Sequence, residues 1–339
     1  ATRVAHRWEA SSRGAPTTQG LPVPLGLDAH GRPVVVDVVR DGPHALVAGT
    51  TGAGKSELLQ SLVLGLALTT SPRDLAIALV DYKGGASFGG CVGLPHVVGQ
   101  VTDLEPGLAG RALAGLRAEL RRREHVVAGA GATCLDDLPP GVLPRLLVVV
   151  DEFRALADDL PDFLPGLLRL ASQGRSLGVH LVLATQRPAG AVTADMRANI
   201  SLRIALRQID TGDSHDVIDA PHAARIPVDR PGRAVLRRGD GEPFAFQCAH
   251  AAAPAPRGTD AVRAAPRWGA APVSPGGHAP DAPDQVTVLV AAAREAAVLA
   301  GHVPFPAPWL PGLPGRVTPS DLPGAGTAPG DVPGRLPLA

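Results

Sequence analysis

The segment GTTGAGKS, residues 49–56, contains the residue types that bind phosphate. Its glycines let backbone N–H groups turn inward around phosphate oxygens, and the Lys55 ammonium reaches the β and γ phosphates. The Ser56 hydroxyl is the expected ligand of Mg²⁺. The segment therefore predicts a nucleotide-binding loop made of Gly49, Thr50, Thr51, Gly52, Ala53, Gly54, Lys55 and Ser56. A Gly-rich turn without a ligand is the alternative, but the apolar run before the loop and the helical pattern after it favour phosphate binding.

A hydrolase of nucleotides also needs carboxylates at the end of a buried strand. The segment RLLVVVDEF contains an uninterrupted apolar run, Leu146–Val150, which is typical of a parallel strand covered on both faces. Asp151 and Glu152 follow this run. We assign Asp151 to Mg²⁺ and Glu152 to the catalytic base. Two acids that merely cap the next helix are the alternative.

Three further apolar runs complete the predicted sheet: His44–Ala48, Leu75–Asp81 and Val179–Gln186. Ligands of open α/β sheets bind at the carboxyl ends of the strands. Thr185 and Gln186 are therefore placed to sense the γ-phosphate or to orient water, although a polar residue often ends a strand without any such role. The alternation of strand and helix patterns predicts an α/β fold with a parallel-sheet core and flanking helices.

Composition divides the chain of 339 residues into three parts. Apolar runs alternate with turn residues through about Gln247, whereas Ala, Pro and Gly dominate from Ala249 onward. We expect an N-terminal linker at residues 1–19, one α/β domain at 20–250, and a Pro/Ala/Gly-rich linker or tail at 251–339 with a short helix near 286–300. The chain begins without Met, as expected of a piece of a longer protein.

Charge and cysteine content restrict the function classes. The 32 basic residues balance 32 acidic ones, which weakens a nucleic-acid function without excluding it. Three cysteines, none in a CxxC pair, indicate a reducing compartment and argue against a disulfide scaffold or a zinc site. The apolar run that starts at Leu58 is interrupted by polar residues and is shorter than the ~20 residues that a membrane span needs. A cytoplasmic location is therefore expected.

Five segments in this order, GTTGAGKS, DYKGGASF, LLVVVDEF, GRSLGVHLVLATQRP and ANISLRIALR, resemble the FtsK/SpoIIIE family of hexameric P-loop motors. The resemblance covers roughly Gly20–His250. DYKGGASF followed by LPHVVGQVTDLE is similar to the EccC-type ATPases of type VII secretion, and PAPWLPGLPGR is similar to segments that join their successive ATPase domains. The resemblance implies a RecA-like P-loop NTPase fold, ATP as the nucleotide, and a homo-oligomer, of hexameric type, or sister ATPase domains as partners.

The resemblance also implies that a neighbouring subunit contributes an arginine to the γ-phosphate. It points to the arginine in NISLRIAL, Arg203. The other candidates are Arg207, Arg175, Arg187 and Arg197.

The same resemblance places DYKGG, and with it Asp81 and Lys83, at the rim of the nucleotide site. Lys83 and Lys55 are the only lysines of the chain. A guanidinium does not freely replace the compact ammonium in a tight site, which favours a functional Lys83 over a solvated loop lysine.

The helical pattern EPGLAGRALAGLRAELRRREHVV carries a row of arginines: Arg111, Arg117, Arg121, Arg122 and Arg123. A basic patch for a polymer substrate is one interpretation. A solvated helix face is favoured, because Glu119 and Glu124 dilute the charge and no aromatic residues are interleaved.

Two functions fit the resemblance. One is a motor that drives or gates the export of small folded proteins by type VII secretion, at the inner face of the membrane within a membrane-anchored assembly. The other is a double-stranded DNA translocase of the FtsK type. A nucleotide-binding adaptor without hydrolysis is disfavoured, because Lys55, Ser56, Asp151 and Glu152 are all present.

Overall fold

The computed structural model describes residues 1–14, 20–82, 87–102, 106–161, 163–253 and 283–309. A sheet of ten strands runs through these residues in the order β2-β1-β10-β9-β8-β3-β7-β6-β4-β5. Its strands are β1 (Pro22–Asp28), β2 (Pro33–Asp37), β3 (His44–Ala48), β4 (Leu75–Asp81), β5 (Val97–Val101), β6 (Arg145–Asp151), β7 (Val179–Thr185), β8 (Leu202–Leu206), β9 (Arg233–Arg238) and β10 (Phe244–Cys248).

The helices are α1 (Thr2–Gly14), α2 (Lys55–Thr69), α3 (Pro106–Gly129), α4 (Phe153–Asp159), α5 (Phe163–Gly174), α6 (Ala194–Asn199), α7 (Thr211–Ile218) and α8 (Gln285–Leu299). Short 3₁₀ turns lie at Gly89–Gly93, Leu135–Asp137 and Pro221–Arg225. No helix among the described residues has the length and apolar character that crossing a membrane requires.

The central strands β3, β4, β6, β7 and β8 are parallel and buried along their whole length. Successive side chains of a strand point to opposite faces, so each strand supplies two cores. In β6, Leu147 and Val149 join the core that α2 covers, whereas Leu146 and Val148 join the core that α3 and α5 cover. The two helix layers therefore explain why these strands are apolar at every position.

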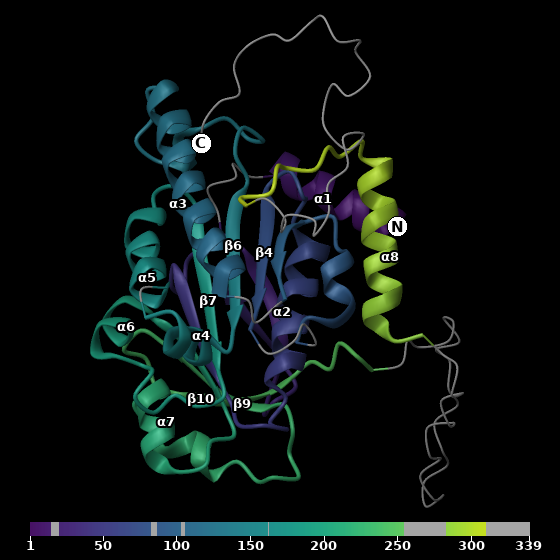
Figure 1. Cartoon of the computed structure of the whole chain (residues 1–339). Coiled ribbons are helices and arrows are strands. Elements are labelled where there is room, and N and C mark those ends of the chain that lie inside the picture. The colour runs from purple at the N-terminus through teal and green to yellow at the C-terminus, as the bar shows by residue number, and fades with distance from the viewer. Residues whose placement is uncertain (15–19, 83–86, 103–105, 162, 254–282, 310–339) are drawn as a thin grey trace, which may run out of the picture. The chain divides into compact units, whose positions relative to one another are not determined.

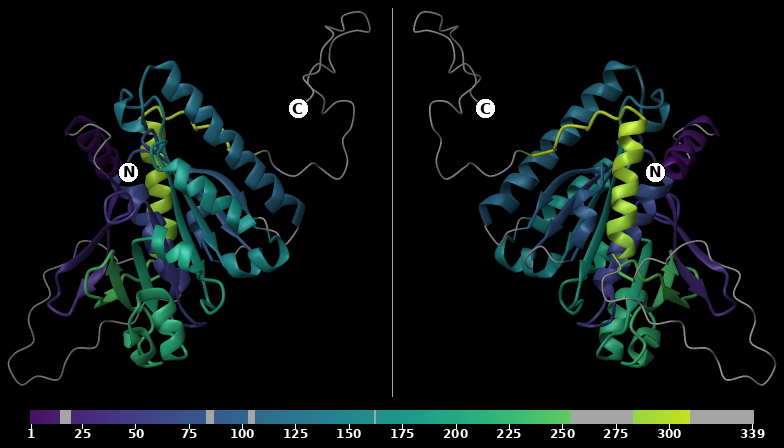
Figure 2. Two further views of the ribbon diagram at one scale, coloured as in Figure 1. Left: turned by 90° about the vertical axis from the view of Figure 1, so that its left-hand side faces the viewer. Right: turned by 90° about the vertical axis from the view of Figure 1, so that its right-hand side faces the viewer.

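Figure 1 shows this sandwich, with α3 and α5 on one side of the sheet and α2 and α8 on the other. The left panel of Figure 2 faces the side of α3, and the right panel faces the side of α8. The antiparallel strands β1, β2, β9 and β10 extend the sheet beyond β8. The sequence patterns predicted β3, β4, β6 and β7, but neither the parallel strands β5 and β8 nor this antiparallel extension.

Both expected linker regions contain helices that pack on the α/β domain. α1 occupies residues 2–14, where the sequence predicted a linker, and its Trp8 indole donates a 3.0 Å hydrogen bond to the Ala67 carbonyl of α2. The helix expected near 286–300 is α8, whose buried Val286 and Val290 belong to the same core as α2. The core therefore extends beyond both boundaries drawn from composition, because isolated apolar residues at helical spacing suffice to dock a helix.

Candidate active site

The loop Gly49–Gly54 links the end of β3 to the start of α2, so the N-terminus of α2 points at the space that the loop surrounds. Gly54 adopts φ 97°, a conformation that favours glycine, and a Cβ there would come within 2.8 Å of the Gly232 nitrogen. The first-turn residues Lys55 and Ser56 follow directly. A helix N-terminus with inward backbone N–H groups attracts phosphate.

The end of β8 and the segment before β9 hold this loop from behind. The Arg207 carbonyl accepts hydrogen bonds from the Thr50 backbone nitrogen at 3.0 Å and from the Thr50 hydroxyl at 3.1 Å. The Gly232 nitrogen donates to the Ala53 carbonyl at 2.8 Å. The loop is therefore shaped by contacts with distant segments as well as by its own glycines.

Lys55, Asp151 and Glu152 form a buried cluster at the carboxyl edge of the sheet. The Lys55 ammonium forms an ion pair with Asp151 and lies 2.9 Å from Glu152 Oε1. The exposed fractions of Lys55, Asp151 and Glu152 are 4%, 1% and 4%. Buried charges persist when they are paired, so the lysine and the carboxylates stabilise one another here. The structure thus brings together three of the residues that the sequence assigned to nucleotide chemistry.

Glu152 has a left-handed backbone, with φ 57° and ψ 44°, between the end of β6 and the start of α4. A non-glycine residue in this region is uncommon and costs energy, and such residues gather at functional sites. Its nitrogen donates a 2.9 Å hydrogen bond to Asp151 Oδ1. The turn directs both carboxylates to Lys55.

Gln186 connects the loop to Glu152. Its side-chain oxygen accepts a 3.0 Å hydrogen bond from the Thr51 hydroxyl, and its backbone nitrogen donates to Glu152 Oε2 at 3.3 Å. Thr185 is fully buried at the end of β7, and its hydroxyl contacts the backbone of Arg187 at 3.2 Å. Gln186 therefore lies where a residue can orient water between the phosphate loop and the carboxylate, whereas Thr185 shapes the turn behind it.

Asp81 lies beside Asp151, because β4 and β6 pair with these two residues in register. It is 1% exposed and accepts a 2.9 Å hydrogen bond from the Ser87 nitrogen. Asp81 therefore lies at the same edge as the cluster. Lys83, the second predicted rim residue, lies outside the described residues.

Tyr82 lies next to Asp81 and makes a contact that the sequence did not predict. Its hydroxyl donates a hydrogen bond to the Asp159 carboxylate at the end of α4. This bond and burial raise the pKa of Tyr82 to about 12, so the hydroxyl remains a donor at neutral pH. Tyr82 thereby ties the end of β4 to the helix that follows Glu152. The only feature of the sequence that could have pointed to this role is that Tyr82 is the single tyrosine of the chain.

The candidate trans arginines differ in exposure. Arg203 is 6% exposed, its guanidinium lies 2.7 Å from Asp219 Oδ2, and it also donates to the Val217 carbonyl at 3.4 Å. A role in a neighbouring subunit would require this internal pair to open, and that role stays a prediction. The Arg207 guanidinium donates a 3.3 Å hydrogen bond to the Thr51 carbonyl in the predicted phosphate loop of the same chain. Arg175 and Arg187 are exposed.

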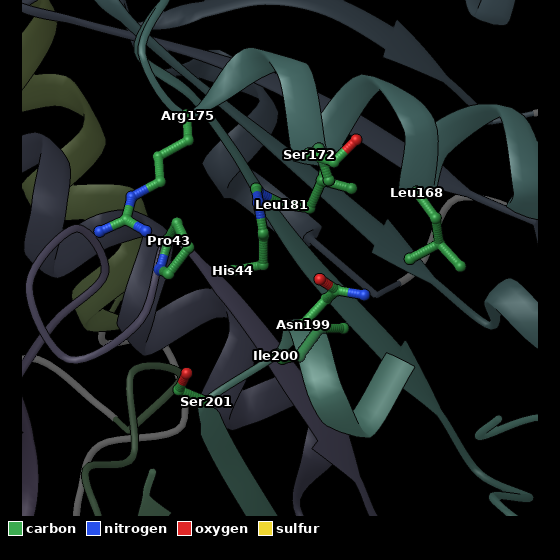
Figure 3. Close-up of a pocket in the computed structure, with 10 residues that line it drawn as sticks. Pro43, His44, Leu168, Ser172, Arg175, Leu181, Asn199, Ile200 and Ser201 are labelled. Atoms are coloured by element: carbon green, nitrogen blue, oxygen red, sulfur yellow. The ribbon is translucent and has the colours of Figure 1, made fainter. Parts of the chain in front are cut away.

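Arg175 lies at a pocket of 280 Å³ at the opposite edge of the sheet from the phosphate loop. Figure 3 shows its side chain near Pro43 and His44, with Asn199 and Ser201 across the pocket. Burial lowers the pKa of His44 to about 4, and this imidazole is neutral at physiological pH. Arg175 therefore lies at the edge of the sheet opposite to Lys55, so it cannot reach the phosphate loop of its own chain.

Comparisons with known proteins agree with this geometry. Residues 11–139 match the model of the FtsK/SpoIIIE family. The type VII secretion system protein EssC of Staphylococcus aureus is 38% identical over 251 residues, which is 70% of this chain and 16% of EssC. The solved cytoplasmic domain of the type VII secretion ATPase EccC of Thermomonospora curvata is 35% identical, with a TM-score of 0.75 over 92% of this chain and 34% of that one. The conjugation coupling protein TcpA of pCW3, solved as a monomer with ATPγS, is 25% identical, with a TM-score of 0.55 over 69% of this chain and 67% of its own.

The chain spans only 16% of EssC and 34% of the EccC chain, so both relatives are much longer than this chain. The similarity to EccC over nearly the whole chain confirms the predicted α/β P-loop fold. The predicted phosphate loop, Gly49–Ser56, lies between β3 and α2, and the Asp151–Glu152 pair lies at the end of β6. Together with the match to the family model, these findings show that the chain belongs to the FtsK/SpoIIIE family, with EccC and EssC of type VII secretion among its relatives.

Proposed function

We propose that this chain is an ATPase domain that binds ATP with Mg²⁺, hydrolyses it to ADP and phosphate, and thereby drives or gates protein export by type VII secretion. The observation that carries the proposal is the buried cluster of Lys55, Asp151 and Glu152 beside the phosphate loop. The relatives support it, since EssC and EccC bear the name of that secretion system and TcpA was solved with an ATP analogue.

The residues of the cluster divide the chemistry. Lys55 binds the β and γ phosphates, and Glu152 accepts a proton from the attacking water. Phosphate oxygens compete with Glu152 for the Lys55 ammonium, so nucleotide binding frees the carboxylate to act as a base. Gln186 orients the water, held by its bond to Thr51.

The donors at the site fit Mg²⁺. This ion prefers oxygen ligands and binds through one or two protein groups together with substrate phosphates and water. The Ser56 hydroxyl and the Asp151 carboxylate supply such oxygens, one at the start of α2 and one at the end of β6. Magnesium would neutralise charge on the phosphates and set their position relative to Glu152.

The proposed setting is the cytoplasmic face of the membrane, where the domain works within a larger membrane-anchored assembly. Its partners are further copies of the chain, of hexameric arrangement, or sister ATPase domains. Its transported substrate is a small secreted protein. These three proposals come from the kinship with EssC and EccC, which are much longer than this chain.

An ATPase assay across protein concentration tests the proposal. The assay has three arms: no addition, a secreted helical-hairpin protein, and double-stranded DNA. We expect Mg²⁺-dependent hydrolysis that the secreted protein stimulates, and Lys55→Ala is the negative control. Stimulation by DNA alone would favour a DNA translocase, and ATP binding without hydrolysis at any concentration would favour a nucleotide-binding adaptor.

A further inference from the structure

The helices α3 and α5 pack side by side on one face of the sheet, and a polar hollow of 560 Å³ opens between them. Arg117 and Arg121 of α3 and Arg169 of α5 line this hollow, together with Glu124 and Gln173. We call it the guanidinium groove. Figure 1 shows α3 and α5 adjacent on the left of the view.

The arginines of the groove differ from their neighbours in the same helix. Arg122 and Arg123 both bind Glu119, at 2.7 Å and 2.8 Å. Arg117, Arg121 and Arg169 are exposed, and within the described part of the chain none of them forms an ion pair or a side-chain hydrogen bond. Glu119 is thus used by Arg122 and Arg123, whereas the groove itself holds three arginines and one acid, Glu124.

This arrangement is unfavourable for the isolated domain. Arg117 and Arg121 are four residues apart on one helix, and like charges at that spacing destabilise a helix. Arg169 adds a third positive charge from α5. A Cβ at Gly166 would lie 3.0 Å from Arg117 Nη2, so this guanidinium lies close to the backbone of α5. The three charges therefore converge on one place where an anionic partner would stabilise them.

An excess of negative charge lies at α7, near the other end of the same helix layer. Asp210 caps α7 through the Asp213 nitrogen at 2.8 Å, and Asp216 is one turn further along. Burial and the charges of Asp210 and Asp216 raise the pKa of Asp213. Among the described residues, Asp210 and Asp213 have no cationic partner, and Arg197 approaches Asp216 only to 3.7 Å. We call residues 210–216 the acidic turn.

The residues that line the groove argue against a nucleic acid as its ligand and favour a polypeptide with carboxylate side chains. Binding of single-stranded nucleic acid uses aromatic side chains on which bases stack, and no aromatic residue lines this groove. Glu124 also lines the groove and can accept a hydrogen bond from an N–H group of a polypeptide. Carboxylates match the forked guanidinium donors in pairs.

We propose that the guanidinium groove of one copy of this chain binds the acidic turn of a second copy, head to tail. Such a heterologous contact repeats around a ring when the rotation closes. The acidic turn follows Arg207, whose carbonyl holds Thr50 of the phosphate loop, so the contact places the groove of the first copy near the proposed ATP site of the second copy. The inference rests on the proposed function for its choice of a self-assembling partner.

Complementary charge reversal tests the contact, with sedimentation velocity of the whole chain as the measurement. The first variant, Arg121→Glu with Arg169→Glu, reverses the groove. The second variant, Asp210→Asn with Asp213→Arg, reverses the acidic turn and keeps an oxygen that can cap α7. We expect each variant alone to self-associate at least about tenfold more weakly than the wild type, because like charges then face each other. An equimolar mixture should regain association, since both contacts become complementary again.

Arg122→Gln on the same helix is the matched control and should leave association unchanged, whereas Arg121→Gln should weaken it. Thermal unfolding confirms that each variant is folded. Wild-type association of either reversed variant overturns the proposal, and so does a mixture that fails to associate. Binding of a polyglutamate peptide or of phosphatidylserine vesicles to the groove, with unchanged self-association, would assign it to another partner. None of these measurements uses ATP, so the contact and the ATPase activity can fail independently.

Discussion

Lys55 Nζ and Glu152 Oε1 lie 2.9 Å apart at the carboxyl edge of the sheet, one at the start of α2 and the other after β6. Asp151 shares the same ammonium. The proposed phosphate ligand Lys55 and the proposed base Glu152 are therefore coupled, because any group that attracts the lysine changes the surroundings of the carboxylate.

Lys55→Ala should abolish nucleotide binding, because the β and γ phosphates lose their cation. It should also lower the stability of the domain, since the buried Asp151 and Glu152 lose the partner of their charges; breaking a buried pair costs about 3–5 kcal/mol. Titration with a fluorescent ATP analogue measures the first effect and thermal unfolding the second. Undiminished nucleotide binding would contradict the assignment of the loop.

Glu152→Gln should keep ATP binding and stop turnover. The amide is close in shape to the carboxylate but cannot accept the proton of the attacking water. The loss of one negative charge beside Lys55 also weakens the internal competitor of phosphate, so ATP affinity should equal or exceed that of the wild type. Comparing the dissociation constant of ATP with kcat separates the two effects, and hydrolysis at the wild-type rate would refute the role of base.

Gln186→Ala should lower kcat with little change in ATP affinity if Gln186 orients water. The matched control is Thr51→Val, which removes the same 3.0 Å hydrogen bond from the other side and leaves the amide in place. We expect the Thr51→Val protein to keep much of its activity. Equal losses of kcat in both variants would mean that the bond only shapes the loop.

Arg203→Ala should leave ATP affinity nearly intact and, if Arg203 is the trans arginine, reduce turnover by roughly 10³–10⁵. Because Asp219 loses a partner at 2.7 Å, it should also lower the melting temperature. Mixing Arg203→Ala with Glu152→Gln subunits should restore hydrolysis at one kind of interface, provided that the two proteins assemble together.

The same mixing with Arg175→Ala or Arg207→Ala in place of Arg203→Ala provides the comparison. Restoration with one of these, and none with Arg203→Ala, would transfer the trans role to the exposed Arg175 or to Arg207 and leave Arg203 as a structural link between β8 and the end of α7.

Val290→Ala in α8 should destabilise the domain by about 1–2 kcal/mol, because the side chain is 8% exposed within the core that α2 covers. Val298→Ala, on the same helix but 80% exposed, is the matched control and should change stability by less than about 0.5 kcal/mol. Equal effects in chemical denaturation would show that α8 does not dock on the domain.

The sequence by itself determined the local parts of the site. The order of residue types in GTTGAGKS predicts a phosphate loop, because glycines permit the tight turn. The apolar run before Asp151 predicts a strand that is buried on both faces. The carboxyl ends of parallel strands meet at one edge, which is why Lys55, Asp151 and Glu152, each assigned from its own motif, lie together in the structure.

Tertiary structure decided what depends on contacts between distant segments. Arg203 lies in a recognisable motif, but the sequence does not show its partner. Only the fold shows that Arg203 is buried and paired with Asp219. α8 lies in an Ala-rich segment whose composition resembles a linker, yet its few apolar residues fit a surface that α2 provides. The convergence of Arg169 on Arg117 and Arg121 likewise requires that α5 lie beside α3, because charge patterning along one helix cannot reveal a charge that a second helix contributes.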